Sequence, residues 1–255
     1  MLTSGLKCAI LNYHSIGDDL LSVPSSVFES TIKTLSENGY IGISIDNLTK
    51  FYADSDNTEK KLIVITFDDC FESAYTKGVP ILQNYGFSGT FYISTGYIGK
   101  TDSRRNKGIL IERSYIKLEQ IKELLHNNFE IGAHTDTHPN LTDISPLNVR
   151  TEIHRSKEIL QDYLGTEINS FAYPRGKHNE NIVGIVKESG FSSATTSNLP
   201  GINTTKTNVF KLKRYGGGVP TQGLKLLDLA SGMLDSEMFF NQFNPLQLIK
   251  KLHLL

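Results

Sequence analysis

Short apolar runs alternate with longer amphipathic stretches along most of the chain. Short runs are typical of buried strands, and stretches with an apolar residue every three or four positions are typical of helices with one buried face. The predicted strands cover residues 8–13, 62–67, 89–94, 129–133, 168–173, 192–196 and 209–213, and the predicted helices cover residues 25–38, 72–85, 117–128, 146–164 and 179–189. This alternation indicates an α/β fold with a parallel sheet, and its seven units favour a closed barrel over an open sheet.

Other segments lie outside this alternation. The polar stretch 54–61 and the basic stretch 99–107 are predicted to be loops. After the last predicted strand, glycines at 216–218 introduce a tail with two apolar-rich segments, 224–233 and 244–255. We predict that both segments are helices that pack back onto the barrel. A membrane-surface or dimerising role is the alternative, which the few positive charges of the tail disfavour.

Composition narrows the classes of function. Of the 255 residues, 26 are Lys or Arg and 27 are Asp or Glu, so the formal net charge is −1 and the chain lacks the basic surface of a dedicated nucleic-acid binder. Two cysteines, Cys8 and Cys70, are too few for a disulfide framework or a thiolate metal site. The sequence shows no signal-peptide core and no apolar stretch of about 18 residues, so we expect a cytoplasmic protein without stable membrane insertion.

The first candidate motif is Thr66-Phe67-Asp68-Asp69, directly after an apolar run. Two adjacent carboxylates at the end of a buried strand are costly unless something pairs with them. A strand that has just ended can turn both acids toward one cleft, where one holds a cation while the other stays free as a base. The alternative is structural: an aspartate caps the following helix and stabilises its free N–H groups.

The second motif places His134 and His138 four residues apart, again after a predicted strand. Within one helical turn two such imidazoles point the same way, which is the usual local geometry for two metal-ligating histidines. The same spacing by itself also occurs on protein surfaces. Together with one aspartate, the two histidines would form a mixed N/O site that suits zinc and other imidazole-binding divalent metals, with positions open for water.

The third motif, residues 171–176, reads Phe-Ala-Tyr-Pro-Arg-Gly and also follows a predicted strand. Proline and glycine force a sharp exit from the strand, which leaves backbone N–H groups that can donate to an oxyanion. A simple turn above a packed aromatic ring is the alternative. All three motifs fall at the ends of predicted strands, which share one face of a parallel β/α barrel, the face where catalytic residues gather.

The order of these motifs resembles the polysaccharide deacetylases of the NodB-homology type, carbohydrate esterase family 4. The resemblance covers residues 7–215 and includes softer features at residues 12–15, 89–93 and 190–191. It implies a distorted (β/α)7 barrel formed by this deacetylase domain. Residues 216–255 would then be a C-terminal helical tail that packs on the barrel.

The resemblance also implies a role for each matching residue. Asp69, His134 and His138 would hold a divalent metal, zinc in the first place, with cobalt, nickel or manganese as alternatives. Asp68 would be the general base that takes a proton from the attacking water. The backbone N–H of Tyr173, together with the metal, would stabilise the oxyanion of the tetrahedral intermediate. Such a site is chemically coherent, because a bound divalent metal lowers the pKa of its water toward about 7 and an adjacent carboxylate completes the deprotonation.

Three positions depart from the family pattern. Cys70 stands where a glycine usually follows the two aspartates, which affects the local turn but not the ligands. The arginine that often precedes the third motif and steadies the base is missing, because Asn169 and Ser170 stand there. Arg214, at the end of the last predicted strand, is the candidate substitute. The late Leu-x-His motif that carries the general acid is also absent.

Two histidines are candidates for the missing general acid. His14 ends the first predicted strand and His178 follows the third motif. We prefer His14 because its place at a strand end puts it at the mouth of the barrel, although a packing or capping role is the alternative for this residue.

The favoured function is that of a metal-dependent hydrolase that removes N-acetyl groups from amino sugars, in surface polysaccharide or glycoconjugate biosynthesis. The expected partner is an N-acetylated sugar, whether polymeric, lipid-linked or nucleotide-linked. One alternative is a weakly active or non-catalytic glycan-binding relative, and another is a hydrolase of a different non-peptide C–N bond in a small molecule. An intact Asp68 favours an enzyme, because a purely binding protein has no need of a base.

Overall fold

A computed structural model describes residues 6–19, 22–54, 60–106, 109–197, 200–216 and 224–233 of the chain. One sheet of nine strands contains β1 (Lys7–Tyr13), β2 (Tyr40–Ile43), β3 (Lys61–Phe67), β4 (Thr90–Ile93), β7 (Glu130–Ala133), β8 (Ser170–Ala172), β9 (Ser193–Thr196), β10 (Asn203–Thr204) and β11 (Leu212–Lys213). The helices are α1 (Ser25–Glu37), α2 (Ile45–Ala53), α3 (Val79–Asn84), α4 (Leu118–His126), α5 (Pro146–Leu164), α6 (Glu180–Glu188) and α7 (Leu224–Ser231).

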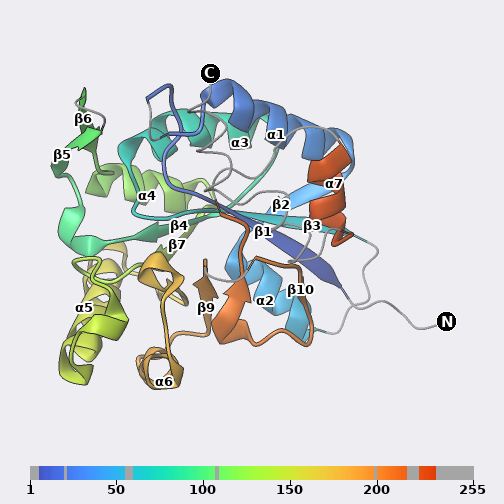
Figure 1. The fold of residues 1–255 in the computed structure, drawn as a ribbon. Coiled ribbons are helices and arrows are strands. Elements are labelled where there is room, and N and C mark those ends of the chain that lie inside the picture. The colour runs from blue at the N-terminus through green and yellow to red at the C-terminus, as the bar shows by residue number, and fades with distance from the viewer. Residues whose placement is uncertain are drawn as a thin grey trace, which may run out of the picture.

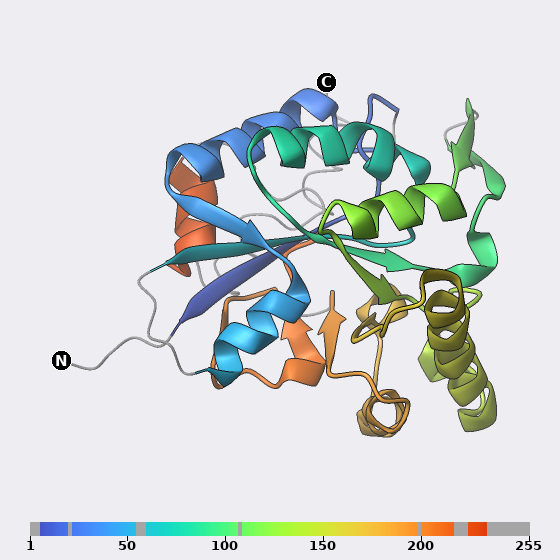
Figure 2. The same ribbon diagram turned by 180° about the vertical axis from the view of Figure 1, so that it is seen from behind.

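The strand order is β10-β1-β3-β4-β7-β8-β9-β11, with β2 paired beside the first half of β3. From β1 to β11 every neighbouring pair along this order is parallel. Helices surround the sheet in both views (Figures 1 and 2). The predicted α/β class and its barrel-like parallel sheet are confirmed.

The sheet nearly closes on itself through Tyr215, which lies two residues after the end of β11. The Tyr215 N–H donates to the Ile10 carbonyl at 2.8 Å, and the Asn12 N–H donates to the Tyr215 carbonyl at 2.8 Å. Next to this junction, β10 pairs antiparallel with the first residues of β1. The last parallel strand is therefore brought back beside the first.

Side chains of the central strands alternate between two buried clusters, because successive residues of a strand point to opposite faces. Cys8 and Ile10 of β1 and Leu62 of β3 belong to a smaller cluster inside the barrel. The residues that alternate with them along each strand pack outward against the helices. Ile45 and Leu48 of α2 also belong to the inner cluster. Helix α2 therefore closes the end of the barrel at which the strands begin.

A partly buried glutamate ties α2 to that end. Glu130, the first residue of β7, accepts hydrogen bonds from the Asp46 N–H at 2.9 Å, the Thr90 hydroxyl at 2.8 Å and the Ser170 hydroxyl at 2.6 Å. Burial raises the pKa of Glu130, and these donors oppose that effect. The apolar and polar contacts together leave the opposite end of the barrel as the open one.

Two segments predicted as single elements differ from the structure. The predicted helix 72–85 contains a π-helical turn at Ala74–Gly78 before α3. Pro80 has no N–H and cannot make the regular backbone bond to Thr76, so a regular α-helical ladder is not possible across this position. The predicted strand 209–213 is a 3-10 turn at Val209–Lys211, followed by the short strand β11.

Further differences concern elements that the pattern did not reveal. The stretch 99–107, predicted as a loop, instead enters a hairpin in which β5 (Thr101–Asn106) pairs antiparallel with β6 (Ile109–Ser114). Strand β5 is polar throughout, so no apolar alternation marked it. Strand β2 and helix α2 were not predicted either. The signal available for α2 is its N-cap, because the Ser44 side chain accepts the Asn47 N–H at 3.2 Å.

The tail returns to the barrel in its first predicted segment. Helix α7 places Leu226, Leu229 and Ala230 in the outer core cluster, beside β1. The second predicted tail helix, 244–255, lies outside the described residues. Among the residues that are described, none of the helices is long and apolar enough to cross a membrane.

Candidate active site

The inner face of the barrel becomes polar where the strands end. Along β1 the inward series passes from Cys8 and Ile10 to Asn12, and the register partner of Asn12 on β3 is Thr66. The Thr66 hydroxyl donates to Asn12 Oδ1 at 3.1 Å. Asp68 follows Thr66 by two positions, so the alternation of a strand carries its side chain to the same face.

Asp68 forms a buried ion pair with Arg214. Arg214 Nη1 donates to Asp68 Oδ1 and Nη2 donates to Oδ2, both at 2.7 Å, and the two side chains are 0% and 4% exposed for Arg214 and Asp68. Burial by itself would raise the pKa of this carboxyl group, but the guanidinium outweighs it and lowers the pKa of Asp68 well below its ordinary range. Asp68 is therefore ionised at neutral pH.

Asp69 reaches the same mouth through a sharp turn. Asp69 (φ 61°) and Cys70 (φ 58°) both adopt the left-handed conformation that residues other than glycine rarely take. The turn sends the two consecutive acids toward one cleft. The helical segment that follows begins at Glu72, and neither carboxylate accepts a hydrogen bond from its N–H groups, so neither acid caps it. The Cys70 side chain is buried in the outer core, so the turn forms with cysteine at the position where glycine is usual.

The two motif histidines lie on a loop after β7 rather than on a helix. Thr135 (φ 65°) and His138 (φ 58°) are left-handed, and the Thr135 hydroxyl accepts the His138 N–H at 3.1 Å. The prediction that a helical turn aligns the two imidazoles is therefore wrong, because no helix is present at these residues. The loop itself brings the rings of His134 and His138 to a centroid separation of 4.9 Å.

Asp69, His134 and His138 form a cluster of three metal-type donors, with one atom from each within 4.8 Å of the others. Asp69 Oδ1 lies 3.5 Å from His134 Nε2 and 3.2 Å from His138 Nε2. His134 Nδ1 lies 2.8 Å from the Ala172 carbonyl, which can only accept, so Nδ1 carries a proton and the neutral ring turns its Nε2 lone pair toward Asp69. Lone pairs that face each other need a proton or a cation between them, and this donor set fits zinc.

The titration of these groups depends on burial and on their neighbours. Burial, and after it the nearby His134, lower the pKa of His138 to about 4. Burial also acts to lower the pKa of His134, but Asp68 and Asp69 outweigh it and raise that pKa. At neutral pH His138 therefore offers a lone pair. When the His134 ring is also protonated at Nε2, it holds that second proton more tightly than a free imidazole does.

The turn after β8 does not offer the N–H group that the resemblance implies. The Tyr173 N–H donates to the Thr195 carbonyl of β9 at 3.1 Å, so its proton is used within the sheet and is not available to an oxyanion. This corrects the role expected for Tyr173. Arg175, two residues further along, is exposed and left-handed (φ 57°, ψ 15°).

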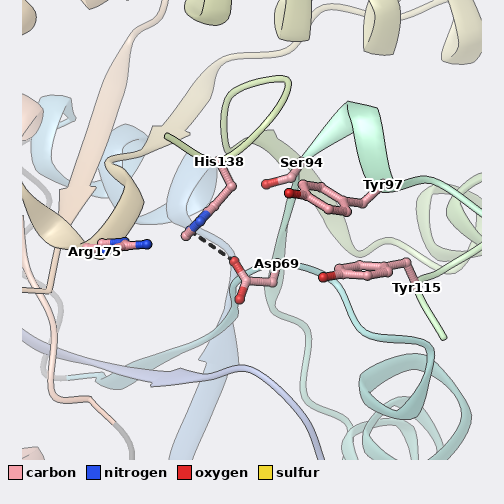
Figure 3. A pocket seen from close by; sticks show the side chains of 6 residues that line it. All are labelled: Asp69, Ser94, Tyr97, Tyr115, His138 and Arg175. Carbon is pink, nitrogen blue, oxygen red and sulfur yellow. Dashed lines mark ion pairs between the residues drawn. The ribbon is translucent and has the colours of Figure 1, made fainter. Parts of the chain in front are cut away.

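A pocket of about 200 Å³ opens beside Asp69 and His138. Tyr97 and Tyr115 line one side of it with rings stacked 4.9 Å apart, and Arg175 extends toward it from the opposite side (Figure 3). Sequence reasoning did not single out these three residues, although Arg175 stands inside the third motif. Aromatic rings and a guanidinium beside a donor cluster form a surface suited to a small polar ligand.

The two histidines that are candidates for the general acid differ in their surroundings. His14 is exposed at the end of β1 and interacts electrostatically with Asp68 and Asp69. The ring of His178 stacks on Tyr173 with a centroid separation of 4.7 Å, and its Nδ1 lies 3.0 Å from the Gly176 carbonyl. The structure thus brings His14, but not His178, near Asp68 and Asp69.

Sequence reasoning also missed two partners of the buried ion pair. Asn12 Nδ2 donates to Asp68 Oδ2 at 3.1 Å, and Arg214 Nη2 donates to the Ser197 hydroxyl at 2.8 Å. The even spacing of Asn12 from the inward-facing Ile10 was the signal available in the sequence. Ser197 follows β9 directly, and its neighbours gave no comparable signal.

Comparison with known proteins gives a family for this arrangement. The polysaccharide deacetylase family matches residues 55–194, more than half of the chain. YxkH of Bacillus subtilis (strain 168), whose name describes it as a polysaccharide deacetylase, is 27% identical over 209 residues, or 82% of this chain and 70% of YxkH. The poly-beta-1,6-N-acetyl-D-glucosamine N-deacetylase of Staphylococcus aureus (strain MRSA252) is 25% identical over 178 residues, or 66% of this chain and 59% of that enzyme.

Solved structures share the fold. The deacetylase PplD of Streptococcus pyogenes, in complex with acetate, superposes with a TM-score of 0.76 at 24% identity and covers 91% of this chain and 100% of its own. BC0361, a polysaccharide deacetylase from Bacillus cereus, gives a TM-score of 0.69 at 26% identity and covers 83% of this chain and 65% of its own. The family match includes both aspartates of the first motif and both histidines of the second. The chain belongs to the polysaccharide deacetylase family.

Proposed function

We propose that the protein is a metal-dependent hydrolase that removes N-acetyl groups from amino sugars of a surface polysaccharide or glycoconjugate. The observation that carries this proposal is the three-donor cluster at the open end of the barrel with an ionised acid next to it. The staphylococcal relative, named for N-deacetylation of poly-beta-1,6-N-acetyl-D-glucosamine, supports a polymer of N-acetylated glucosamine as the substrate class.

Asp69, His134 and His138 would hold the metal. One carboxylate oxygen and two imidazole nitrogens fit zinc, and cobalt, nickel or manganese are alternatives. A divalent metal held there would supply Lewis-acid chemistry, because it would polarise the acetyl carbonyl and a water molecule. Three protein ligands leave coordination positions open for the reactants.

Asp68 is the proposed general base that accepts a proton from the attacking water. Arg214 and Asn12 hold both of its oxygens in place, and the low pKa keeps the carboxylate in the ionised form that a base requires. Attack on the acetyl carbonyl places negative charge on its oxygen. Arg175 is the positively charged residue among those that line the pocket, so its guanidinium is our candidate donor to that oxygen.

The departing amine needs a proton, which His14 is proposed to deliver. His14 is exposed at the mouth beside both acids, whereas His178 is stacked against the turn and is the alternative. Breakage of the C–N bond then yields acetate and a free amino sugar in equal amounts. Water supplies the oxygen and both hydrogens that are divided between the two products.

The test is product formation from a panel of N-acetylated hexosamine oligomers incubated with zinc-loaded protein. We expect acetate and free amine to appear together, in a one-to-one ratio, from at least one member of the panel. The matched control is Asp68→Asn, which retains the shape of the side chain but cannot act as an anionic base. Absence of acetate from every oligomer, with zinc demonstrably bound, would contradict the proposal.

A further inference from the structure

The loop that carries the two histidines has a backbone that needs support. Thr135 and His138 both lie in the left-handed region, which residues other than glycine adopt only where the surroundings hold them there. His134 directly precedes this segment and His138 ends it, so any relaxation of the loop would move two proposed ligands relative to Asp69. The structure should therefore contain groups that fix this loop.

One carboxylate of α5 makes three hydrogen bonds to the loop. Glu152 Oε2 accepts the Asp136 N–H at 3.0 Å and the Thr137 N–H at 2.8 Å. Glu152 Oε1 accepts the Thr137 hydroxyl at 2.6 Å. Two consecutive backbone N–H groups between the histidines are thus bound to a single charged acceptor, and charge-assisted bonds of this kind are stronger than neutral ones.

The support is rigid because α5 is anchored in the core. Ile153, the residue after Glu152, is completely buried, and Val149 is nearly so. The same loop is also held from the segment after β4: Asp136 Oδ1 accepts the Thr95 hydroxyl at 2.7 Å, and the Asp136 carbonyl accepts the Gly96 N–H at 2.8 Å. Arg155, also on α5, pairs with Asp136 Oδ2 at 3.0 Å, but its side chain is 64% exposed and such pairs contribute little.

We propose that Glu152 is a positioning residue for the metal site: it holds the loop in the conformation that directs His134 and His138 toward Asp69. This inference rests on the proposed function, because it concerns the same three ligands. Partners that orient metal ligands typically change metal affinity by 10- to 100-fold when they are removed. We therefore expect Glu152→Ala to weaken zinc binding by about that factor without changing the ligands themselves.

Zinc affinity is measured by competition with a chromophoric chelator, using the full chain. Glu152→Gln tests geometry against charge, because one amide oxygen can still accept both N–H groups while the amide nitrogen donates to the Thr137 hydroxyl. We expect this variant to bind zinc much more tightly than Glu152→Ala. Glu158→Ala is the matched control, since Glu158 is exposed on the same helix and should leave zinc affinity unchanged.

Amide hydrogen exchange of the metal-free protein gives a readout independent of zinc. In Glu152→Ala the N–H groups of Asp136 and Thr137 should exchange at least about tenfold faster, while the buried strand β7 keeps its protection. If wild type binds zinc and Glu152→Ala binds it equally well, the inference is wrong. If wild type binds no zinc, the proposed metal site fails, and unchanged exchange at Asp136 and Thr137 would then overturn the role of Glu152 separately.

Discussion

Replacement of Arg214 by methionine should be among the most damaging single changes to stability. The guanidinium is fully buried and satisfies both oxygens of Asp68 at 2.7 Å, so its removal leaves a buried carboxylate without a counter-charge. Breaking a buried pair in this way costs about 3–5 kcal/mol. Exposed pairs contribute about 0–1 kcal/mol, so Arg150→Met is the matched control, because Arg150 pairs with Glu188 at 2.5 Å on the surface.

The pH dependence of this loss has a definite sign. In wild type the pKa of Asp68 is lowered on folding, so its contribution to stability is present above the unfolded pKa of about 3.9 and is lost as the pH falls through the folded value. In Arg214→Met burial still raises that pKa while the guanidinium no longer lowers it, so the pKa of Asp68 lies well above its wild-type value. The variant therefore gains stability relative to wild type as the pH falls, and the gap between them is widest near neutral pH.

Urea unfolding followed by circular dichroism measures both effects, with the midpoint and slope recorded from about pH 4 to pH 8. The double variant Asp68→Asn/Arg214→Met removes both charges and should be more stable than Arg214→Met alone near neutral pH. A loss below about 1 kcal/mol for Arg214→Met, or a double variant less stable than Arg214→Met at neutral pH, would refute this account of the ion pair.

Three further predictions test the proposed chemistry. Asp68→Asn should retain zinc but lose at least about 10²-fold in turnover, and loss of zinc measured by elemental analysis would instead make Asp68 a ligand. His14→Ala should slow hydrolysis of amide substrates much more than that of an activated acetyl ester, whose phenolate leaves without protonation, and His178→Ala should be nearly neutral in the same two assays. Although burial opposes it, Asp68 and Asp69 raise the pKa of His134, so zinc must displace a proton there. The Kd for zinc, measured by chelator competition, should therefore fall as the pH rises from about 6 to 8, and a flat profile would contradict this.

The sequence predicted the fold class and the shared mouth of the three motifs because both depend on where apolar runs end. A strand of seven residues such as β3 is visible as an apolar run, and the position of Asp68 two residues after Thr66 already determines its face. The polar hairpin strand β5 carries no such pattern, because it has no apolar positions. Strand β2 does have apolar residues at three of its four positions, so its signal was present in the sequence and was not used.

The parts of the site that were not predicted depend on long-range hydrogen bonds. The Tyr173 N–H donates to the Thr195 carbonyl on the neighbouring strand β9, and the residues of the third motif do not indicate this bond. The left-handed loop between the histidines likewise depends on Glu152, which lies on the next helix. Arg214 was the exception, because its position directly after a predicted strand indicated the mouth of the barrel.

A zinc titration of turnover tests the central claim most directly. Protein stripped with a chelator is supplied with increasing zinc, and acetate release from an N-acetylated hexosamine oligomer is measured at each step. The account predicts negligible release without metal, a rise that saturates at one zinc per chain, and no rise for the ligand variant His138→Ala at the same concentrations. Full activity in the stripped protein, or saturation unaffected by His138→Ala, would contradict a metal-dependent deacetylase that uses Asp69, His134 and His138.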